Sequence, residues 1–240
     1  LLYFMSQDDV MDDFSDKSNA QLLPLSSLFF SDFVCRYHSI LPHASGFWSY
    51  FDTYMKEWAE SVVWERENHW GVAKEYSEED LIFLSRKAAA MKIPFAAICI
   101  LSGQAWAIKA FSKMMDYDQI VYQMIDDWRD WKEDLSRGSY TYLLVQTMKY
   151  CGLSDASQLT EAHVKKAIFM DELGEKIFQM AKSYNKLSLK CISAIDSPYL
   201  KAYISLEESL CDRILDKIRD EKAMMLKGGL DSLLWNMTKK

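Results

Sequence analysis

The sequence predicts an all-α protein, folded as a single-domain helical bundle. Apolar residues recur at i, i+3, i+4 and i+7 over most of the 240 residues, which is the spacing of amphipathic helices. Only 8 glycines and 4 prolines interrupt the chain, fewer than the frequent turns of a β-sandwich or barrel require. Half of the residues are hydrophobic, enough to fill a sizeable core. No repeat or shift in composition marks a boundary, so we expect one domain over residues 1–240.

The breaks in this pattern divide the chain into nine expected helices. Ser77 and Thr160 are each followed by acidic residues, a combination typical of a helix N-terminus. Gly152 and the pair Gly228-Gly229 are expected to end helices, because glycine adopts the left-handed conformation found there. The expected helices span residues 1–15, 22–40, 46–69, 78–101, 104–114, 118–136, 140–150, 160–187 and 199–224.

Charge, cysteine content and hydropathy exclude several classes of protein. A net charge of −7 has the wrong sign for a protein that neutralises nucleic-acid phosphates. The 5 cysteines are odd in number and include no CxxC pair, so neither a disulfide framework nor a zinc knuckle is indicated, and a reducing cytoplasm fits best. The longest uncharged run, residues 93–108, is shorter than the ~20 apolar residues of a membrane span. No signal peptide is visible at the start.

The first candidate site is an acidic cluster near the N-terminus, the DDxxDD string of residues 8–13. Helical spacing places Asp8, Asp9 and Asp12 on one face, and the preceding turn of that face carries Leu1, Leu2 and Met5. Unpaired carboxylates one turn apart repel by about 0.2–0.5 kcal/mol per pair, so they require a counter-charge. This is the pattern of a cation site at the edge of an apolar cavity.

The second candidate site has Asp126, Asp130 and Asp134 at i, i+4 and i+8, all projecting from one side of a helix. The alternative for either cluster is a solvated acidic face of an amphipathic helix. An ordinary exposed face mixes lysine and arginine with its acids, and neither of these faces does. Two facing carboxylate helices would hold Mg²⁺ together with a diphosphate, because Mg²⁺ binds carboxylate and phosphate oxygens. An apolar wall beneath them would hold a hydrocarbon chain.

Three segments resemble the class I isoprenoid synthase superfamily. Residues 8–13 look like its first aspartate-rich motif, and residues 122–130 (YQMIDDWRD) are similar to the FQxxDDxxD motif of prenyl diphosphate synthases. Between them, Lys87-Ala88-Ala89 resembles the helix whose lysine binds diphosphate in that family. The resemblance implies the helical-bundle fold of this superfamily, with the active-site cavity between the helices. It also implies N-terminal helices that would precede residue 1, and it is compatible with a homodimer.

The resemblance implies a set of site residues and a cofactor. The cofactor is Mg²⁺, with three ions when substrate is bound. The metal ligands are Asp8, Asp9, Asp12, Asp126, Asp127, Asp130 and Asp134, and among them Asp8, Asp9, Asp12, Asp126 and Asp130 are the catalytic residues. The residues expected to bind the substrate diphosphate are Arg86, Lys87, Gln123, Arg129, Lys132 and Arg137, with Lys87 the best single candidate.

Several subfamilies fit the second cluster. Its 0, +4, +8 spacing is that of the metal triad of terpene synthases, whereas residues 129–134 (RDWKED), followed by Arg137-Gly138, resemble a string of phytoene synthases. Chain-extending synthases carry an arginine pair after the first motif, and residues 14–18 (FSDKS) lack it. We therefore expect a Mg²⁺-dependent terpene synthase, a carbon–oxygen lyase that ionises geranyl, farnesyl or geranylgeranyl diphosphate. The alternatives are a prenyltransferase, either elongating or head-to-head, and a non-catalytic regulatory subunit of the same fold.

Overall fold

The computed structural model describes residues 2–12 and 21–227, except for the side chains of Asp8, Asp9 and Asp12. Within these ranges the chain is all-α, and the sole pairing of extended backbone is an isolated bridge between Trp70 and Ser139. This confirms the predicted all-α class. None of the helices in the described ranges is long and apolar enough to cross a membrane.

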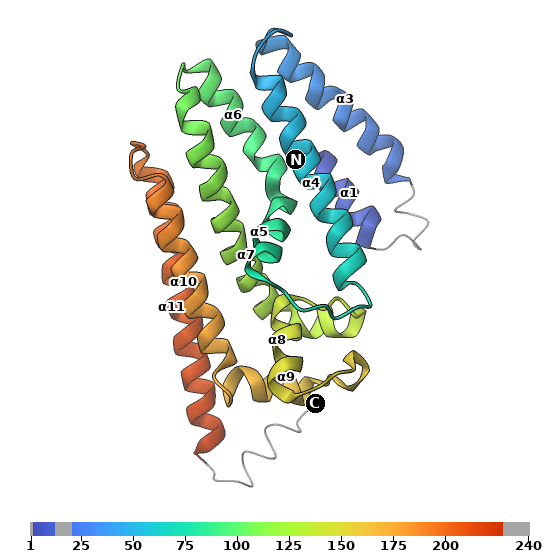
Figure 1. Cartoon of the computed structure of the whole chain (residues 1–240), viewed down its shortest axis with the longest axis vertical. Coiled ribbons are helices and arrows are strands. Elements are labelled where there is room, and N and C mark those ends of the chain that lie inside the picture. The colour runs from blue at the N-terminus through green and yellow to red at the C-terminus, as the bar shows by residue number, and fades with distance from the viewer. Residues whose placement is uncertain (1, 13–20, 228–240) are drawn as a thin grey trace.

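The helices are arranged around one long central helix, α7 (Figure 1). The α-helices before it are α1 (Leu2–Asp12), α3 (Leu22–Ile40), α4 (Phe47–His69), α5 (Glu78–Ser85) and α6 (Lys92–Leu101). The α-helices that follow are α7 itself (Ile108–Arg137), α8 (Tyr142–Cys151), α9 (Glu161–Phe169), α10 (Leu173–Cys191) and α11 (Pro198–Leu226). Short 3₁₀ helices occur at η1 (Arg86–Met91), η2 (Ala105–Ala107) and η3 (Ala156–Gln158).

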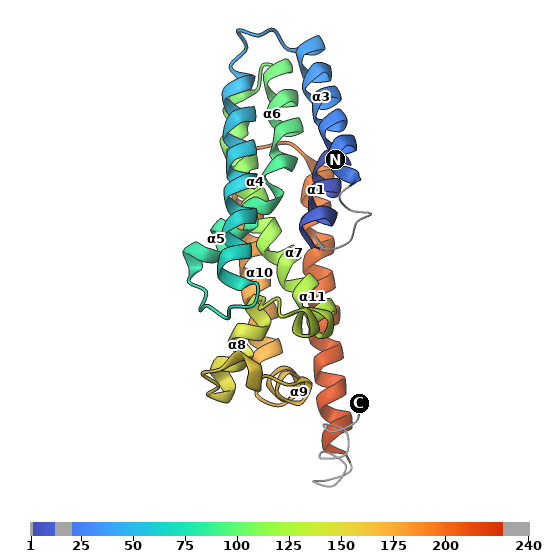
Figure 2. The same ribbon diagram turned by 90° about the vertical axis from the view of Figure 1, so that its right-hand side faces the viewer.

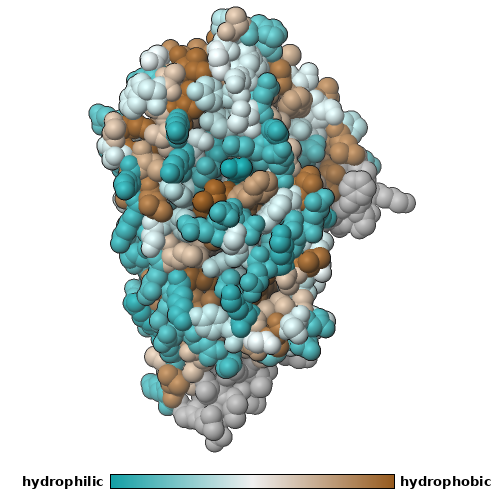
Figure 3. All heavy atoms as spheres, in the orientation of Figure 1, coloured by the Kyte–Doolittle hydropathy of each residue, from teal (hydrophilic) through white to brown (hydrophobic). Residues whose placement is uncertain are grey.

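The elements lie on two sides of α7. Helices α4 and α6 lie on one side, α10 and α11 on the other, and α8 and α9 close the lower end (Figure 1). Helices α1 and α3 form an outer pair, which the perpendicular view places beside each other (Figure 2). The face seen in Figure 3 is mainly hydrophilic, with apolar side chains gathered at its upper end over α6 and α3. Ile98 of α6 and Leu28 of α3 are among the exposed apolar residues of these segments.

Local capping explains several helix ends. Ser77 accepts the N–H of Asp80, whose carboxylate accepts the N–H of Ser77 in return, so a capping box begins α5 as predicted. Thr160 begins α9 in the same way. Gly152 follows α8 with a φ of 65°, which confirms it as a helix end. The expected stop at Gly228-Gly229 lies outside the described residues.

Four expected helices are divided or joined differently in the structure. The stretch 78–101 is divided into α5, η1 and α6, and Pro94 lies in the first turn of α6, where its missing N–H leaves no helical bond unmade. The expected break at 115–117 is wrong: α7 is continuous, because Met114 and Met115 keep its apolar face buried and no glycine or proline intervenes. The stretch 160–187 is broken at Glu172, whose φ is 63°. Residues 13–15 of the first expected helix lie outside the described ranges.

The hydrophobic core has two parts that share α7. The first half of α7, including Ile108 and Met114, packs with buried residues of α4 and α6. The second half, including Val121, Ile125 and Trp131, packs with buried residues of α8 to α11. Because α7 uses its apolar side for both cores, its acidic side is left to line the space next to α4.

Candidate functional site

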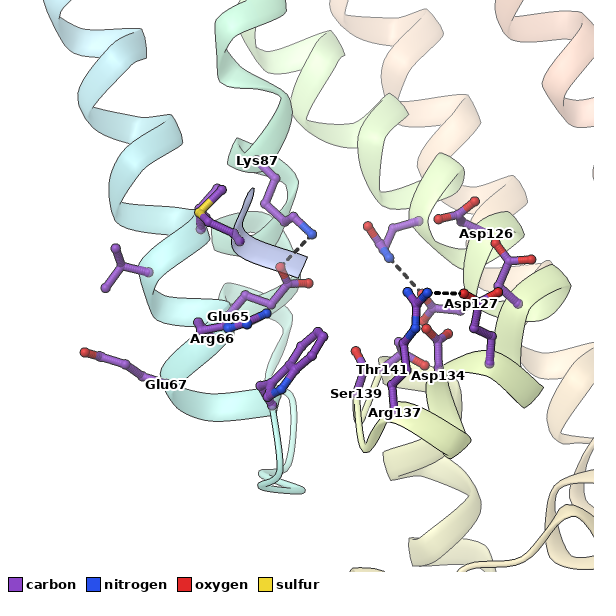
Figure 4. Close-up of a pocket in the computed structure, with 17 residues that line it drawn as sticks. Glu65, Arg66, Glu67, Lys87, Asp126, Asp127, Asp134, Arg137, Ser139 and Thr141 are labelled. Atoms are coloured by element: carbon purple, nitrogen blue, oxygen red, sulfur yellow. Dashed lines mark hydrogen bonds and ion pairs between the residues drawn. The ribbon is translucent and has the colours of Figure 1, made fainter. Parts of the chain in front are cut away.

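The candidate site is a pocket of about 670 Å³ between α4 and α7 (Figure 4). Residues of α4 form one wall and residues 123–137 of α7 form the other, while Ser139 and Thr141 close one end. A volume of this size is typical of a small-molecule site. The acidic residues that line the pocket are Glu65, Glu67, Asp126, Asp127, Asp130, Glu133 and Asp134, and the basic ones are Arg66, Lys87 and Arg137.

The end of α1 reaches the same pocket. Met11 lines it, and Met11 lies in the helix that carries Asp8, Asp9 and Asp12. Aromatic contacts anchor this helix, since the rings of Tyr3 and Phe4 lie 5.8 and 5.0 Å from Trp58 of α4. The side chains of the three aspartates lie outside the described residues, so their predicted roles as ligands stay predictions.

The α7 wall holds the second predicted cluster together. Asp126, Asp127, Asp130 and Asp134 all line the pocket, as does Gln123. Residues at i, i+4 and i+8 of a helix share one face, and the acidic face of α7 is directed at α4 across the pocket (Figure 4). A concave space therefore lies in front of this cluster, and its predicted role as a metal site stays a prediction.

Asp127 lies at the base of this wall and links α7 to α8. Its carboxylate is 3% exposed and accepts a hydrogen bond of 2.8 Å from Gln123 Nε2. Burial raises the pKa of Asp127 to about 7, although the bonds from Gln123 and from the backbone N–H of Leu143 act in the opposite direction. Leu143 is in the first turn of α8, so this interaction connects Asp127 with that helix. Asp127 thus has a structural role in addition to its place at the pocket.

Asp126 and Asp134 also bind protons more tightly than usual. Burial, with the charges of Asp127 and Asp130, raises the pKa of Asp134 to about 7. Burial and the charge of Asp130 raise the pKa of Asp126, and the charges of Arg129 and Lys87 oppose this shift. Like charges this close together favour a bound cation, which replaces the protons as the counter-charge.

Each basic side chain that lines the pocket is held by a neighbour that also lines it. Lys87 Nζ lies 2.5 Å from Glu65 Oε2, which joins η1 to α4. Arg137 is paired with Glu133 one turn earlier on α7. The guanidinium of Arg66 stacks over the Trp70 ring at 3.8 Å, within the range of a cation–π contact.

Backbone hydrogen bonds fix the closed end of the pocket. The N–H of Gly71 donates to Gly138 O, and the N–H of Tyr140 donates to His69 O, each at 2.8 Å. Gly138 has a φ of 70°, which favours glycine at this turn. These two bonds tie the end of α4 to the end of α7, so the separation of the two walls is set by backbone contacts.

The structure brings together some of the predicted diphosphate-binding residues and leaves others apart. Lys87, Gln123 and Arg137 line the pocket, whereas Arg86, Arg129 and Lys132 are not among its lining residues. Arg86 lies near the Phe83 ring, and Arg129 and Lys132 are exposed on α7. Nothing in the structure assigns these three a role at the pocket, and their predicted role stays a prediction.

Sequence reasoning missed the whole α4 wall. Glu65, Arg66, Glu67 and Trp70 were not predicted to belong to a site, although the charged run 65–67 at the end of a long helix was a signal that could have marked them. Next to them, His69 is buried and stacks on the Tyr76 ring at 3.9 Å. Burial lowers the pKa of His69 to about 4, so its ring is neutral at physiological pH.

The donor set of the pocket fits a hard divalent cation. Its anionic groups are all carboxylates, which are the ligands that Mg²⁺ prefers in proteins. Among the described side chains, no three or more histidine, cysteine, aspartate or glutamate residues converge closely enough to hold a metal ion. The predicted partners on α1 are not part of this count, because their side chains are not described.

Comparison with known proteins gives no match for this chain. No family model matches it, and neither a curated protein nor a solved structure is significantly similar to it.

Proposed function

We propose that the protein is a Mg²⁺-dependent class I terpene synthase that ionises a linear prenyl diphosphate. The observation that supports this most is the gathering of three sequence segments at one pocket. Asp126, Asp130 and Asp134 of α7, Lys87 of η1 and the end of α1 at Met11 all border the same space of about 670 Å³. These are the segments whose sequence resembles the class I isoprenoid synthases, and they are more than 30 residues apart in the chain.

The aspartates would serve to hold the metal. Asp126, Asp130 and Asp134 would bind it from the α7 wall, and Asp8, Asp9 and Asp12 are the proposed ligands on α1. When bound, Mg²⁺ supplies Lewis-acid chemistry by neutralising the charge that develops on the leaving diphosphate. The donor chemistry supports this assignment, because carboxylate oxygens and a diphosphate together suit the coordination of Mg²⁺.

The basic side chains and the apolar lining would orient the substrate. Lys87 and Arg137 carry donors for the diphosphate oxygens at the two sides of the pocket, and charge-assisted hydrogen bonds of this kind are stronger than neutral ones. Met11, Val62 and Val63 provide apolar surface on the α1 and α4 side, where the hydrocarbon chain would lie. In the reaction the C–O bond breaks heterolytically and its electron pair leaves with the diphosphate. The allylic cation then ends by losing a proton or by capturing water.

The proposal is tested by product analysis with the purified protein and Mg²⁺. Geranyl, farnesyl and geranylgeranyl diphosphate are each supplied with and without isopentenyl diphosphate, and the organic and aqueous layers are analysed. A hydrocarbon or alcohol formed from one substrate alone is the expected result. A longer diphosphate formed only with isopentenyl diphosphate would make the protein an elongating prenyltransferase instead. A protein that forms no product and shows no Mg²⁺-dependent thermal shift with diphosphate would be a non-catalytic subunit.

A further inference from the structure

The ion pair between Glu65 and Lys87 connects two elements across one side of the pocket. Glu65 is on α4 and Lys87 on η1, and their charged atoms are 2.5 Å apart (Figure 4). The side chains are 27% and 32% exposed, so the pair is partly shielded from water but borders the open space. The pair is therefore positioned where an anionic ligand would meet it.

Acidic residues outnumber basic ones at the pocket, so the partner of each basic side chain affects how an anion can bind there. Among the described residues, seven acidic side chains and three basic ones line it, so an anion entering alone meets a strongly negative surface. Lys87 is also close enough to Asp126, on the facing helix, to stabilise the charge of that carboxylate. The ammonium thus lies between the α4 wall and the aspartate row, the place where a metal-bound diphosphate would need a cation.

We propose that Glu65 is a built-in counter-anion that occupies Lys87 and that a metal-bound diphosphate displaces it. This inference rests on the proposed function, because it assumes that the ligand is an anion bound with Mg²⁺. Before binding, Glu65 holds the ammonium at the pocket through their ion pair. On binding, the ammonium transfers from the carboxylate to a diphosphate oxygen, so the Glu65 contact opposes binding and limits affinity.

The proposal predicts that a neutral residue at position 65 tightens the binding of diphosphate. Glu65→Gln keeps the size and hydrogen-bonding capacity of the side chain and removes the competing charge. A pair exposed to this extent contributes modestly, and we expect an increase in affinity of about 2- to 5-fold. A merely structural role for Glu65 would leave the affinity unchanged or weaken it.

Glu67 provides a matched control. It lies on the same helix and lines the same pocket, and no ion pair is found for it within the described part of the chain. Glu67→Gln removes the same charge, so it measures how much of the effect comes from the general negative potential of the pocket. We expect this control to change the affinity less than Glu65→Gln does.

The experiment is a double-mutant cycle read by calorimetric titration of inorganic diphosphate in the presence of MgCl₂. The variants are Glu65→Gln, Lys87→Met and their combination, with Glu67→Gln as control, and circular dichroism and thermal melting verify that each is folded. If Lys87→Met does not fold, Lys87→Gln replaces it. We expect Glu65→Gln to tighten binding when Lys87 is present and to have no greater effect than Glu67→Gln when it is absent.

The outcomes separate this inference from the proposed function. Wild-type binding of Mg²⁺–diphosphate with equal effects of Glu65→Gln and Glu67→Gln would overturn the inference and leave the proposed function standing. Weaker binding by Glu65→Gln would also overturn it. A wild-type protein that binds no diphosphate with Mg²⁺ would contradict both.

Discussion

Glu207 of α11 forms a buried pair with Asp118 of α7, and this pair predicts a pH-dependent stability. The two side chains are 8% and 3% exposed. Tyr203 Oη donates a hydrogen bond of 3.1 Å to Glu207 Oε1, while Glu207 Oε2 and Asp118 Oδ1 have no hydrogen-bond partner among the described residues. The nearby cation of α10, Lys182, is paired with Asp212 at 2.5 Å. Two carboxylates so placed share a proton.

The sign and size of the effect follow from the pKa of Glu207. Burial and the charge of Asp118 raise this pKa from its ordinary value of 4.5 to about 9. The folded protein therefore keeps a proton that the unfolded chain loses above pH 4.5. The contribution to stability is fully present below that pH and is lost as the pH rises toward 9, by about 1.4 kcal/mol per pH unit. Between pH 5 and pH 8 the loss is about 4 kcal/mol.

The assay is urea unfolding of the wild type and Glu207→Gln at several pH values from 5 to 8. The side-chain amide introduced by Glu207→Gln can donate a hydrogen bond to Asp118 in place of the shared proton. The variant should therefore lose less stability than the wild type as the pH rises, and it should be the more stable protein at pH 8. Glu208→Gln is the control, because Glu208 is the next residue of α11 and is partly exposed. Equal pH slopes for Glu207→Gln and wild type, or a variant that is less stable at pH 8, would show that Glu207 does not hold the extra proton.

Two further substitutions test the packing of the helical core. Lys92, 3% exposed, is paired with Glu57 and Asp116, so Lys92→Met leaves two carboxylates without their cation and should cost about 3–5 kcal/mol in urea unfolding. A loss below about 1 kcal/mol would contradict this. Gly174→Ala would place a Cβ 3.0 Å from the carbonyl oxygen of Ile168, and we expect it to lower the free energy of unfolding by about 1–3 kcal/mol. An unchanged or raised free energy of unfolding for Gly174→Ala would contradict this, because it would mean that the backbone shifts to accommodate the added Cβ.

The α7 wall of the site was predictable from the sequence because helical geometry alone determines it. Asp126, Asp130 and Asp134 share a face at about 100° per residue, and Gln123 and Arg137 fall within about 20° of its centre. All five line the pocket. The periodicity of one helix is a local property, so no knowledge of packing was needed.

The same helical geometry explains why Lys132, a predicted diphosphate-binding residue, does not lie at the pocket. Lys132 is near the aspartates in the sequence, but on α7 it is rotated by about 160° from the centre of their row. Its ammonium lies near the Trp131 ring, 5.5 Å from its centre, and it does not line the pocket. Proximity in the sequence was therefore a poor guide within a helix, and the angular position was the better one.

The α4 wall could not be predicted, because it depends on how helices pack. The ion pair of Glu65 with Lys87 joins residues 22 positions apart, and the backbone bonds of Gly71 and Tyr140 to the opposite segment join residues still further apart. No local pattern specifies these partners. The division of the expected helix 78–101 at η1 also depends on packing, because η1 places Lys87 on a 3₁₀ turn beside α4.

The most direct test of the account is release of inorganic diphosphate from prenyl diphosphates by the purified protein, measured with Mg²⁺ and with EDTA. We predict release that requires Mg²⁺ and that is abolished in both Asp126→Asn/Asp130→Asn and Asp8→Asn/Asp12→Asn while the variants stay folded. The control Asp216→Asn changes an exposed aspartate of α11 that pairs with Arg219, and it should retain full activity. Release that persists in EDTA, or in either double variant, would contradict the account.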